Sequence, residues 1–340
     1  MVELIISRVL ALFVPVIFVS SGFAQVPKPI KIWDSAPHNA FTDLIYFEGK
    51  WYCTFREAPG HVPMKKGEEG KIRVIVSEDG DHWESFALLS LNNYDLRDPK
   101  ISMAANGKLM LLMGASNYKG AELIGRQSHV SFLNINKKEF SEPKPVKIDT
   151  DIRTDNDWLW RVTWNGKFGY GIVYQIEDPG TIHLVRTRNG KRYSSIAVME
   201  VSGIPNEATI RVLSDNRMVV LLRREGGDQE GYIGVSEEPF DQWFWRKIGF
   251  RIGGPDLFIL SNASFLAGVR VYREDDNYMA LYTGNLTSKW KEVMLLPSGG
   301  DTSYPGISIY GDDIWVSYYS SHEGKAAIYL AKIPLELITG

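Results

Sequence analysis

Several short segments of this sequence carry side chains that can transfer protons, act as nucleophiles or bind anions. They are HNAFTD (38–43), FREAPGH (55–61), DLRDPK (95–100), DNDWLWR (155–161), PNEAT (205–209), LLRREGG (221–227), GGPD (253–256), GVRVYRE (268–274) and GGDTSYPG (299–306). The last segment places Tyr304 between a Gly-Gly-Asp turn and a proline, where a strand is expected to begin. A tyrosine there either packs in the core or presents its hydroxyl for chemistry, so the elements that position it must decide.

Those elements are predicted to be strands almost throughout. KLMLLMGAS, FGYGIVYQI, RMVVLLRRE and YMALYTG are typical strand patterns, and NG, DG, GG and GDD turns separate such runs. No long stretch has helical periodicity, and only the last residues, IPLELITG, could form one helical turn. The sequence therefore predicts an all-β protein.

A repeat indicates how the strands are grouped. SEDGDHW (77–83) is a polar turn closed by an aromatic residue, and looser versions are NINKKEF (134–140), RTRNGKRY (186–193), SEEPFDQWFW (236–245) and TGNLTSKW (283–290). The closing aromatics are Trp83, Phe140, Tyr193, Trp245 and Trp290, roughly 45–57 residues apart, which is close to the length of one four-stranded propeller blade.

Six segments between these turns would be the inner strands: FTDLIYF, RDPKISM, WLWRVTW, NEATIRV, GPDLFIL and SYPGISIY. We therefore expect a six-bladed β-propeller of four-stranded antiparallel blades, with the last blade closed by a strand near Ile30–Trp33. A seven-bladed ring and a β-sandwich are the alternatives. In a propeller the inner strands converge, so residues at their starts would meet at a central site.

Composition limits the function classes. The chain has 340 residues and a net charge of -3, so no broad basic surface indicates binding to nucleic acid or to an anionic membrane. Residues 25–340 are expected to form a single domain. Cys53 is the one cysteine and lies in an apolar run, KWYCTF, so we expect it in the core. There is no Cys pair and no His-x-x-x-His or His-x-x-Glu-His spacing, so neither a metal nor a cofactor is expected.

The first 24 residues differ from the rest. The apolar run LALFVPVIFVSS is too short to span a bilayer comfortably, and the small residues Gly22 and Ala24 follow it. This pattern is typical of a secretory signal peptide over residues 1–24, with a retained anchor as the alternative. It predicts a secreted or periplasmic protein with no stable membrane insertion after cleavage.

The chain resembles the sialidase superfamily of glycoside hydrolases, propeller proteins that carry the BNR or Asp-box repeat. SEDGDHW is similar to the Asp box, although one residue shorter between Gly and Trp. PNEATIRVLSDNRMVVLLRRE (205–225) is similar to the segment with a Glu on one strand and an Arg on the next. TSYPGISIYGDDIWVSYYSSHEG (302–324) is similar to the segment with the nucleophilic tyrosine. In order and rhythm the resemblance extends over essentially the whole chain after residue 24.

The resemblance implies a specific chemistry. Sialidases use a tyrosine nucleophile, which here would be Tyr304, with Glu207 as its base because a free phenol titrates near pH 10. The family binds the substrate carboxylate with three arginines, and Arg223 and Arg270 match the second and third. This implies a retaining, exo-acting hydrolase that releases a terminal sugar, acidic or neutral, from a glycan.

Two positions depart from the family pattern. Ala40 lies about where the first arginine should be. Arg56 matches an arginine that precedes the family's general acid and is expected to contact the substrate, but His61 stands at the position of that acidic residue. The acid would then be His61, a displaced Glu among Glu57, Glu68 and Glu69, or absent. These changes favour another sugar or another linkage over sialic acid itself.

Other residues at the strand starts are expected to line the site. They are His38, Asn39, Arg97 and Asp98, with Trp158 and Trp160 as either a sugar-stacking platform or core aromatics. Two alternative functions remain open. One is a non-catalytic glycan-binding propeller, and the other is a relative with changed chemistry, such as a uronic-acid lyase with His61 or His38 as base.

Overall fold

The computed structural model describes residues 28–175, 178–261 and 264–339, so the predicted signal peptide lies outside the described residues. The described part contains 25 strands and one short helix, α1 (Glu336–Thr339), at the place where one helical turn was predicted. The all-β prediction is confirmed. No helix in the described part of the chain is long and apolar enough to cross a membrane.

The strands form five sheets. The first holds β2 (His38–Phe47), β3 (Lys50–Ala58), β4 (Lys71–Ser77) and β5 (Glu84–Leu89). The second holds β6 (Asp95–Met103), β7 (Leu109–Lys119), β8 (Glu122–Asn134), β9 (Glu139–Phe140) and β10 (Lys144–Pro145). The third holds β12 (Trp158–Asn165), β13 (Phe168–Tyr174), β14 (Thr181–Thr187) and β15 (Arg192–Glu200), with β11 (Lys147–Ile148) parallel to β15.

The fourth sheet consists of two runs of strands that share one long strand. It holds β16 (Pro205–Val212), β17 (Met218–Arg224), β18 (Glu230–Ser236), β19 (Phe244–Ser261), β20 (Ser264–Tyr272), β21 (Asn277–Gly284) and β22 (Lys291–Leu296). The fifth holds β23 (Thr302–Tyr310), β24 (Asp313–Ser320), β25 (Ala327–Pro334) and β1 (Ile30–Trp33). β1 pairs with β25, so a strand from the start of the chain closes the last sheet as predicted.

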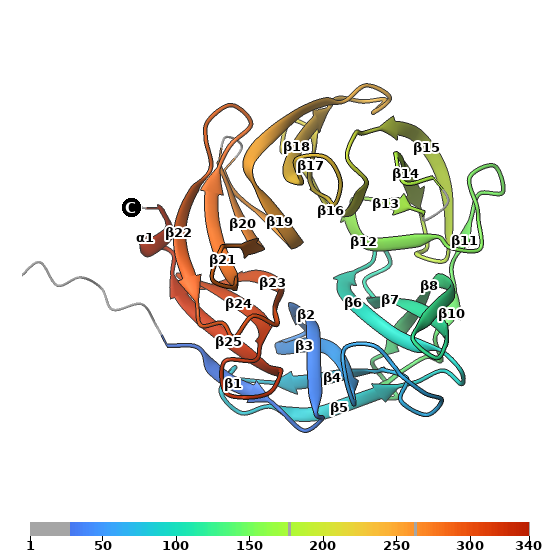
Figure 1. The fold of residues 1–340 in the computed structure, drawn as a ribbon, viewed down its shortest axis with the longest axis vertical. Coiled ribbons are helices and arrows are strands. Elements are labelled where there is room, and N and C mark those ends of the chain that lie inside the picture. The colour runs from blue at the N-terminus through green and yellow to red at the C-terminus, as the bar shows by residue number, and fades with distance from the viewer. Residues whose placement is uncertain (1–27, 176–177, 262–263, 340) are drawn as a thin grey trace, which may run out of the picture.

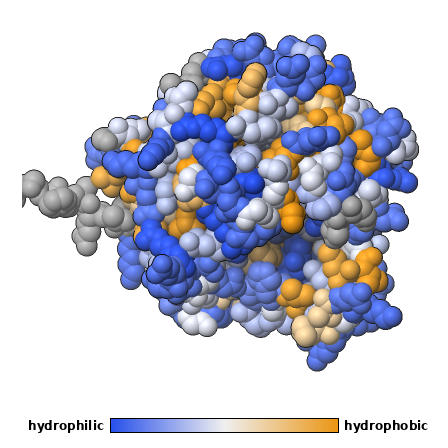
Figure 2. Space-filling model, turned by 45° about the horizontal axis from the view of Figure 1, so that its top comes forward, coloured by the Kyte–Doolittle hydropathy of each residue, from blue (hydrophilic) through white to orange (hydrophobic). Residues whose placement is uncertain are grey.

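The sheets are arranged in a ring, and one strand of each run lies nearest the middle (Figure 1). These innermost strands are β2, β6, β12, β16, β19 and β23, and each contains one of the six predicted inner segments. The space-filling view shows a largely hydrophilic surface on the face toward the viewer, hollowed near its centre (Figure 2).

Each innermost strand has a β-bulge at an equivalent position. The ladder register shifts between Ala40/Asp43, Arg97/Lys100, Leu159/Val162, Pro205/Ala208, Gly253/Asp256 and Ser303/Gly306. At every shift two residues face one residue of the partner strand, which re-aims their side chains. The bulged pairs are Phe41-Thr42, Asp98-Pro99, Trp160-Arg161, Asn206-Glu207, Gly254-Pro255 and Tyr304-Pro305. Tyr304 and Asp98 are thus the first residues of their bulged pairs, and Glu207 is the second residue of its pair.

Buried charged side chains link the innermost strands beneath these bulges. Arg161 lies 3.2 Å from Asp43 and 3.7 Å from Asp256, and Arg211 lies 2.8 Å from Asp256. Asp43 also accepts the Ile101 amide at 2.8 Å. Both carboxylates are at most 2% exposed, so each depends on its partners to offset desolvation.

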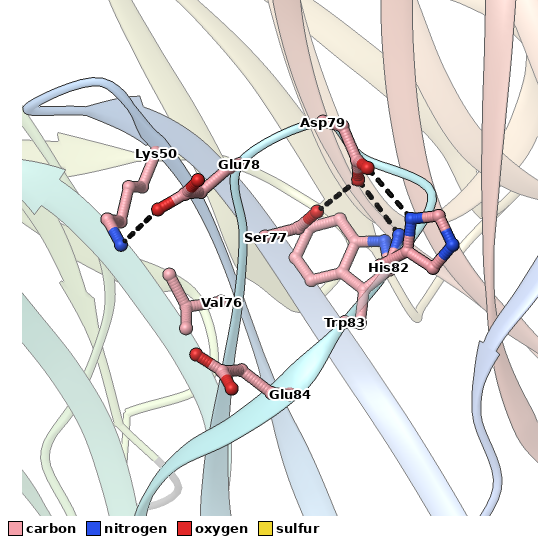
Figure 3. A pocket seen from close by; sticks show the side chains of 8 residues that line it. All are labelled: Lys50, Val76, Ser77, Glu78, Asp79, His82, Trp83 and Glu84. Carbon is pink, nitrogen blue, oxygen red and sulfur yellow. Dashed lines mark hydrogen bonds and ion pairs between the residues drawn. The ribbon is translucent and has the colours of Figure 1, made fainter.

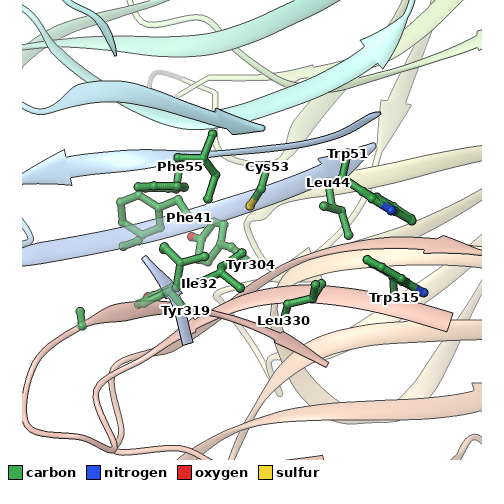
Figure 4. Close-up of a cluster of buried hydrophobic side chains, with 14 of the residues drawn as sticks. Ile32, Phe41, Leu44, Trp51, Cys53, Phe55, Tyr304, Trp315, Tyr319 and Leu330 are labelled. Carbon is green, nitrogen blue, oxygen red and sulfur yellow. The ribbon is translucent and has the colours of Figure 1, made fainter. Parts of the chain in front are cut away.

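Apolar clusters fill the space between neighbouring sheets. In one of them Trp51 of β3 stacks on Trp315 of β24, with ring centroids 4.2 Å apart (Figure 4). Cys53 lies in the same cluster and is fully buried, which agrees with the prediction that it is a core residue. Burial raises the pKa of its thiol well above the ordinary value.

Two of the repeated polar turns share one hydrogen-bonding scheme. In the turn before β5, Ser77 accepts the Gly80 amide at 2.7 Å and Trp83 donates to the Gly80 carbonyl at 3.1 Å. In the turn before β15, Thr187 accepts the Gly190 amide at 2.9 Å and the Tyr193 hydroxyl donates to the Gly190 carbonyl at 3.1 Å.

One detail of the repeat differs from the prediction. In the turn before β19 the ring that donates to the turn is Trp243, which bonds the Phe240 carbonyl at 3.0 Å, whereas the sequence pattern indicated Trp245. Trp245 lies within β19 and stacks on Trp243, with centroids 5.5 Å apart. The SEEPFDQWFW segment offers two tryptophans, and Trp243, which directly precedes β19, is the one that closes the turn.

Removing the buried carboxylate of Asp256 tests the ion pairs that join the innermost strands. Asp256→Ala would leave Arg161 and Arg211 buried without their shared partner, so we expect the free energy of unfolding to fall by about 3–5 kcal/mol. Urea denaturation followed by tryptophan fluorescence measures this. Asp215→Ala, which removes an exposed partner of Arg217, should leave stability nearly unchanged. Equal effects of the two changes would contradict the structural role of Asp256.

Candidate functional site

Tyr304 and Glu207 meet at the bulges of β23 and β16. The Tyr304 hydroxyl donates a short hydrogen bond to Glu207 Oε1, and the Gly254 amide donates to Oε2 at 2.8 Å. The two side chains are 7% and 4% exposed. The Tyr304 ring packs against Phe41, with ring centroids 4.9 Å apart (Figure 4). The backbone of Tyr304 has a φ of 52°, a conformation held by its surroundings.

Gly254 is required where it is. Its φ is +56°, and a Cβ there would lie 2.8 Å from Cδ2 of Tyr304. A side chain would therefore displace the tyrosine ring from Glu207.

The electrostatics keep the phenol neutral and the carboxylate ionised. Burial raises the pKa of Tyr304 well above its usual value, and the charges of Glu207 and Asp98 raise it further. Burial also opposes ionisation of Glu207, but Arg223, the Tyr304 hydroxyl and the Gly254 amide outweigh it and hold the pKa of Glu207 below its usual value. Glu207 is thus placed to take the phenol proton when Tyr304 forms a bond.

The two arginines expected to bind a substrate carboxylate both lie at this pair. Arg223 contacts Glu207 Oε1 at 2.9 Å and also pairs with Glu225. Arg270 lies over the Tyr304 ring, 5.8 Å from its centroid, and donates to the Thr302 carbonyl at 2.7 Å and the Tyr319 hydroxyl at 2.8 Å. Arg223 Nε is buried and has no hydrogen-bond partner in the described part of the chain.

Asp98 has an unusual environment for a carboxylate. It is 8% exposed and sits at its bulge with a φ of 49°, yet no described residue forms a hydrogen bond or ion pair with its carboxylate. Burial raises its pKa to about 6, with Arg97 opposing and Glu207 adding to the shift. A carboxyl group in such a setting can be protonated near neutral pH and can donate that proton.

His38, His61 and Asp301 form a cluster beside the pair, which we term the His–Asp cluster. His38 Nε2 lies 2.9 Å from Asp301 Oδ2, and His61 Nδ1 lies 3.9 Å from Asp301 Oδ1. The His61 side chain is half exposed, and desolvation still lowers its pKa to about 4, against the effect of Asp301. His61 is therefore neutral near pH 7, which does not support the predicted role of histidinium acid there.

Arg56 and Arg97 both pair with Asp95 rather than facing open space. Arg56 is fully buried, donates from Nε to Asp95 Oδ1 at 3.2 Å and from Nη1 to the Gly60 carbonyl at 2.9 Å. Arg97 lies 2.7 Å from Asp95 Oδ2 and donates to the His61 carbonyl at 3.2 Å. Arg56 has no surface with which to contact a substrate, so this geometry gives it a positioning role instead. The partners of Arg97 are thus Asp95 and the His61 carbonyl, and Arg97 forms no ion pair with Asp98 in the described part of the chain.

Two further predicted lining residues are buried. Asn39 has no exposed surface and its amide donates to the Ala36 and Ala326 carbonyls, at 2.8 and 3.0 Å. Trp160 is 2% exposed and packs with Tyr304, with ring centroids 6.1 Å apart. In this conformation Asn39 holds a turn and Trp160 is a core aromatic beneath the site.

Sequence reasoning missed the roles of Asp301 and Tyr319. Tyr319 joins Arg270 to Asp301, donating to Asp301 Oδ1 at 2.9 Å. Asp301 stands in the Gly-Gly-Asp turn that the sequence had marked as a turn only. The signal available was its position three residues before Tyr304.

A surface pocket lies elsewhere, at the polar turn between β4 and β5 (Figure 3). It is lined by Lys50, Val76, Ser77, Glu78, Asp79, His82, Trp83 and Glu84. None of the predicted site residues lines it. The polar groups there bond one another, as His82 and Asp79 do at 2.8 Å, so we place the candidate site at the bulges instead.

Comparison with known proteins places this chain by fold. No protein-family model and no curated protein matches the sequence. A protein of unknown function from Dyadobacter fermentans DSM 18053 is 17% identical with a TM-score of 0.77, and the match covers 91% of this chain and 98% of that one.

Two solved glycoside hydrolases also match. Trypanosoma rangeli sialidase in complex with sialic acid is 10% identical with a TM-score of 0.63, and the match covers 92% of this chain but 58% of the sialidase. Penicillium chrysogenum alpha-L-arabinanase complexed with arabinobiose is 11% identical with a TM-score of 0.67, over 92% and 99% of the two chains. At these identities the likeness shows a shared propeller-like fold.

Asp98→Asn tests the electrostatics of the site without a substrate. Because the pKa of Asp98 is raised to about 6 from 3.8, its ionisation destabilises the folded protein as pH rises through this window. We expect the variant to be more stable than wild type at pH 8 by up to about 3 kcal/mol, and to gain little at pH 3.5. Urea denaturation at the two pH values measures this.

Glu207→Gln is the matched control with the opposite sign. The pKa of Glu207 is lowered, so its ionised form stabilises the fold above its unfolded pKa, and that contribution is lost as pH falls through its folded pKa. The variant should lose stability at pH 8. If Asp98→Asn were destabilised to the same extent at both pH values, the unfavourable ionisation of Asp98 would be refuted.

Proposed function

We propose that this protein is an exo-acting glycoside hydrolase related to the sialidase superfamily, releasing a terminal sugar with retention of configuration. The observation that carries the proposal is the buried hydrogen bond from the Tyr304 hydroxyl to Glu207, formed by two bulges at equivalent places in the ring. A core tyrosine has no need of an ionised carboxylate, an arginine and a backbone amide arranged on its hydroxyl.

The first half of the reaction uses three groups. The Tyr304 oxygen bonds to the anomeric carbon while its proton passes to Glu207. Asp98 gives its proton to the departing glycosidic oxygen, a role that a pKa of about 6 permits. Asp98 replaces His61 in this assignment because His61 holds no proton at neutral pH.

The second half reverses the proton movements. Water attacks the anomeric carbon of the tyrosyl glycoside, and Asp98 accepts one proton from that water. The phenolate oxygen departs and recovers its proton from Glu207. Two displacements at one carbon leave the configuration of the released sugar unchanged.

Arg223, Arg270 and His38 supply the recognition groups in this proposal. Arg223 and Arg270 flank Tyr304, where a carboxylate or hydroxyls next to the anomeric carbon would lie. The solved neighbours are in complex with sialic acid in one case and with arabinobiose in the other, so the fold accommodates different sugars. The sugar proposed here is a terminal residue of a glycan, acidic or neutral.

Two structural proposals accompany the function. We count the ring as a six-bladed propeller, because six innermost strands share one bulge and the seven-stranded sheet divides at β19. We also propose that residues 1–24 are removed on export, which makes the mature protein secreted or periplasmic. The assays below therefore use the chain from Gln25.

Product analysis tests the proposed reaction. We expect wild type to release one terminal sugar from a panel that includes sialosides, arabinosides and uronic-acid-capped oligosaccharides. Tyr304→Phe should reduce release by about a hundredfold or more, because it removes the nucleophilic oxygen. Tyr318→Phe removes a buried hydroxyl that has no described partner and should leave release unchanged.

Three outcomes would contradict the proposal. Binding without release would indicate a glycan-binding propeller, and an unsaturated product absorbing in the near ultraviolet would indicate a lyase. Equal activity of Tyr304→Phe and wild type would show that the tyrosine only packs.

The pH profile tests the role of Asp98. For the sugar released in that assay, we expect kcat/KM to fall above about pH 6, as Asp98 loses the proton it must donate. In Asp98→Asn this fall of kcat/KM at high pH should be absent, and below pH 6 the variant should be slower than wild type by roughly 100- to 10,000-fold. An aryl glycoside of the same sugar needs little protonation of its leaving group. On this substrate the variant should therefore lose much less of the wild-type rate than on the glycan. An equal loss on both substrates would exclude acid catalysis by Asp98.

A further inference from the structure

The His–Asp cluster brings together three potential metal ligands from distant parts of the chain. His38 is the first residue of β2, His61 lies in the loop after β3, and Asp301 lies in the turn directly before β23. Their ligand atoms all lie within 4.8 Å of one another. The three residues are far apart in the sequence and form no local His or Cys motif, which is why the sequence alone predicts no metal.

We propose that the His–Asp cluster binds a divalent transition metal ion of the zinc type. Two imidazole nitrogens and one carboxylate oxygen are ligands that zinc uses in sites that keep a position open for water or substrate. Zinc holds such atoms at about 2.0–2.2 Å, so three atoms this close together need only small side-chain movements to share one ion.

Neighbouring residues hold the three side chains of the cluster in orientations that suit metal ligands. Asp301 Oδ1 accepts the Tyr319 hydroxyl at 2.9 Å, and Tyr319 in turn accepts Arg270 Nη2 at 2.8 Å. These bonds fix the carboxylate from behind while Oδ2 faces His38. The Phe41 ring packs edge-on to both imidazoles, with centroids 6.4 Å from His38 and 5.3 Å from His61. Hydrogen bonds and packing behind the ligands are a usual feature of metal sites.

The three side chains of the cluster differ in solvent exposure, and the most exposed of them lets an ion reach the cluster from solvent. The side chains of His38, Asp301 and His61 are 10%, 36% and 50% exposed. Neither ring nitrogen of His61 forms a hydrogen bond with a described residue; its closest acidic neighbour is Asp301, at 3.9 Å. The His61 ring can therefore turn onto an ion without breaking an existing hydrogen bond.

The cluster also lies close to the proposed catalytic pair. Tyr319 packs 6.3 Å from the Tyr304 ring, and Arg270 contacts both tyrosines. An ion there would lie near Tyr304 and could bind a hydroxyl or carboxylate of a ligand. The metal site itself does not depend on the proposed hydrolase activity.

Direct metal binding tests this proposal. We would strip the mature protein with a chelator and titrate it with ZnCl2 by calorimetry and with CoCl2 by visible absorption. We expect one ion per chain at micromolar or lower Kd, and a Co²⁺ spectrum of low-symmetry coordination. His61→Ala should weaken binding at least tenfold, as should Asp301→Asn. At the same zinc concentration, bound zinc should raise the Tm of wild type more than that of the variants.

A matched control separates this site from surface binding. His82 and Asp79 form an exposed pair at 2.8 Å with the same ligand types but no third member, so His82→Ala should bind zinc as wild type does. His61 is half exposed, so its replacement should not prevent folding, which circular dichroism checks; His61→Gln is the second variant. No binding by wild type, or unchanged binding by folded His61 and Asp301 variants, would overturn the proposal. Loss of binding in His82→Ala alone would do so as well.

Discussion

The buried charges at the middle of the ring are the constraint on which the rest depends. The innermost strands of neighbouring sheets are not joined by a backbone ladder, so side chains must hold them together. Asp43 bonds Arg161 and the Ile101 amide, and Asp256 bonds Arg211 and the Ile307 amide. Each of these ions would be costly to bury alone. The set therefore stabilises one arrangement of the innermost strands, and with it the positions of the bulges above.

The bulges turn that arrangement into a chemical site. A regular strand alternates its side chains between two faces, whereas an extra residue re-aims them. Phe41, Asp98 and Tyr304 have φ values of 65°, 49° and 52°, which non-glycine residues adopt only when the surroundings hold them. The strain is offset by contacts such as the bond from the Thr42 hydroxyl to the Tyr304 carbonyl, at 2.7 Å.

Burial then gives neighbouring groups different protonation states. Glu207 is ionised because Arg223, Tyr304 and Gly254 all bond it, whereas Asp98 receives no such bond and has a pKa near neutrality. Two carboxyl groups of similar intrinsic acidity thereby differ in pKa, lowered for Glu207 and raised for Asp98. The same desolvation lowers the pKa of Lys100, to about 8, beneath the Tyr304 ring.

The sequence by itself predicted the all-β fold, the six inner segments and the closing strand at Ile30–Trp33. It also singled out Tyr304, Glu207, Arg223 and Arg270 as candidate site residues, which the structure brings together. Alternation, turn residues and repeat spacing are local signals, and the family resemblance supplied the pairing of residues far apart. Only the tertiary structure decided that Arg56, Asn39 and Trp160 are buried, that Asp98 is unpaired, and that Asp301 joins His38 and His61. The burial and the hydrogen-bond partners of these side chains depend on which strands become neighbours across the ring. No local sequence pattern predicts those neighbours.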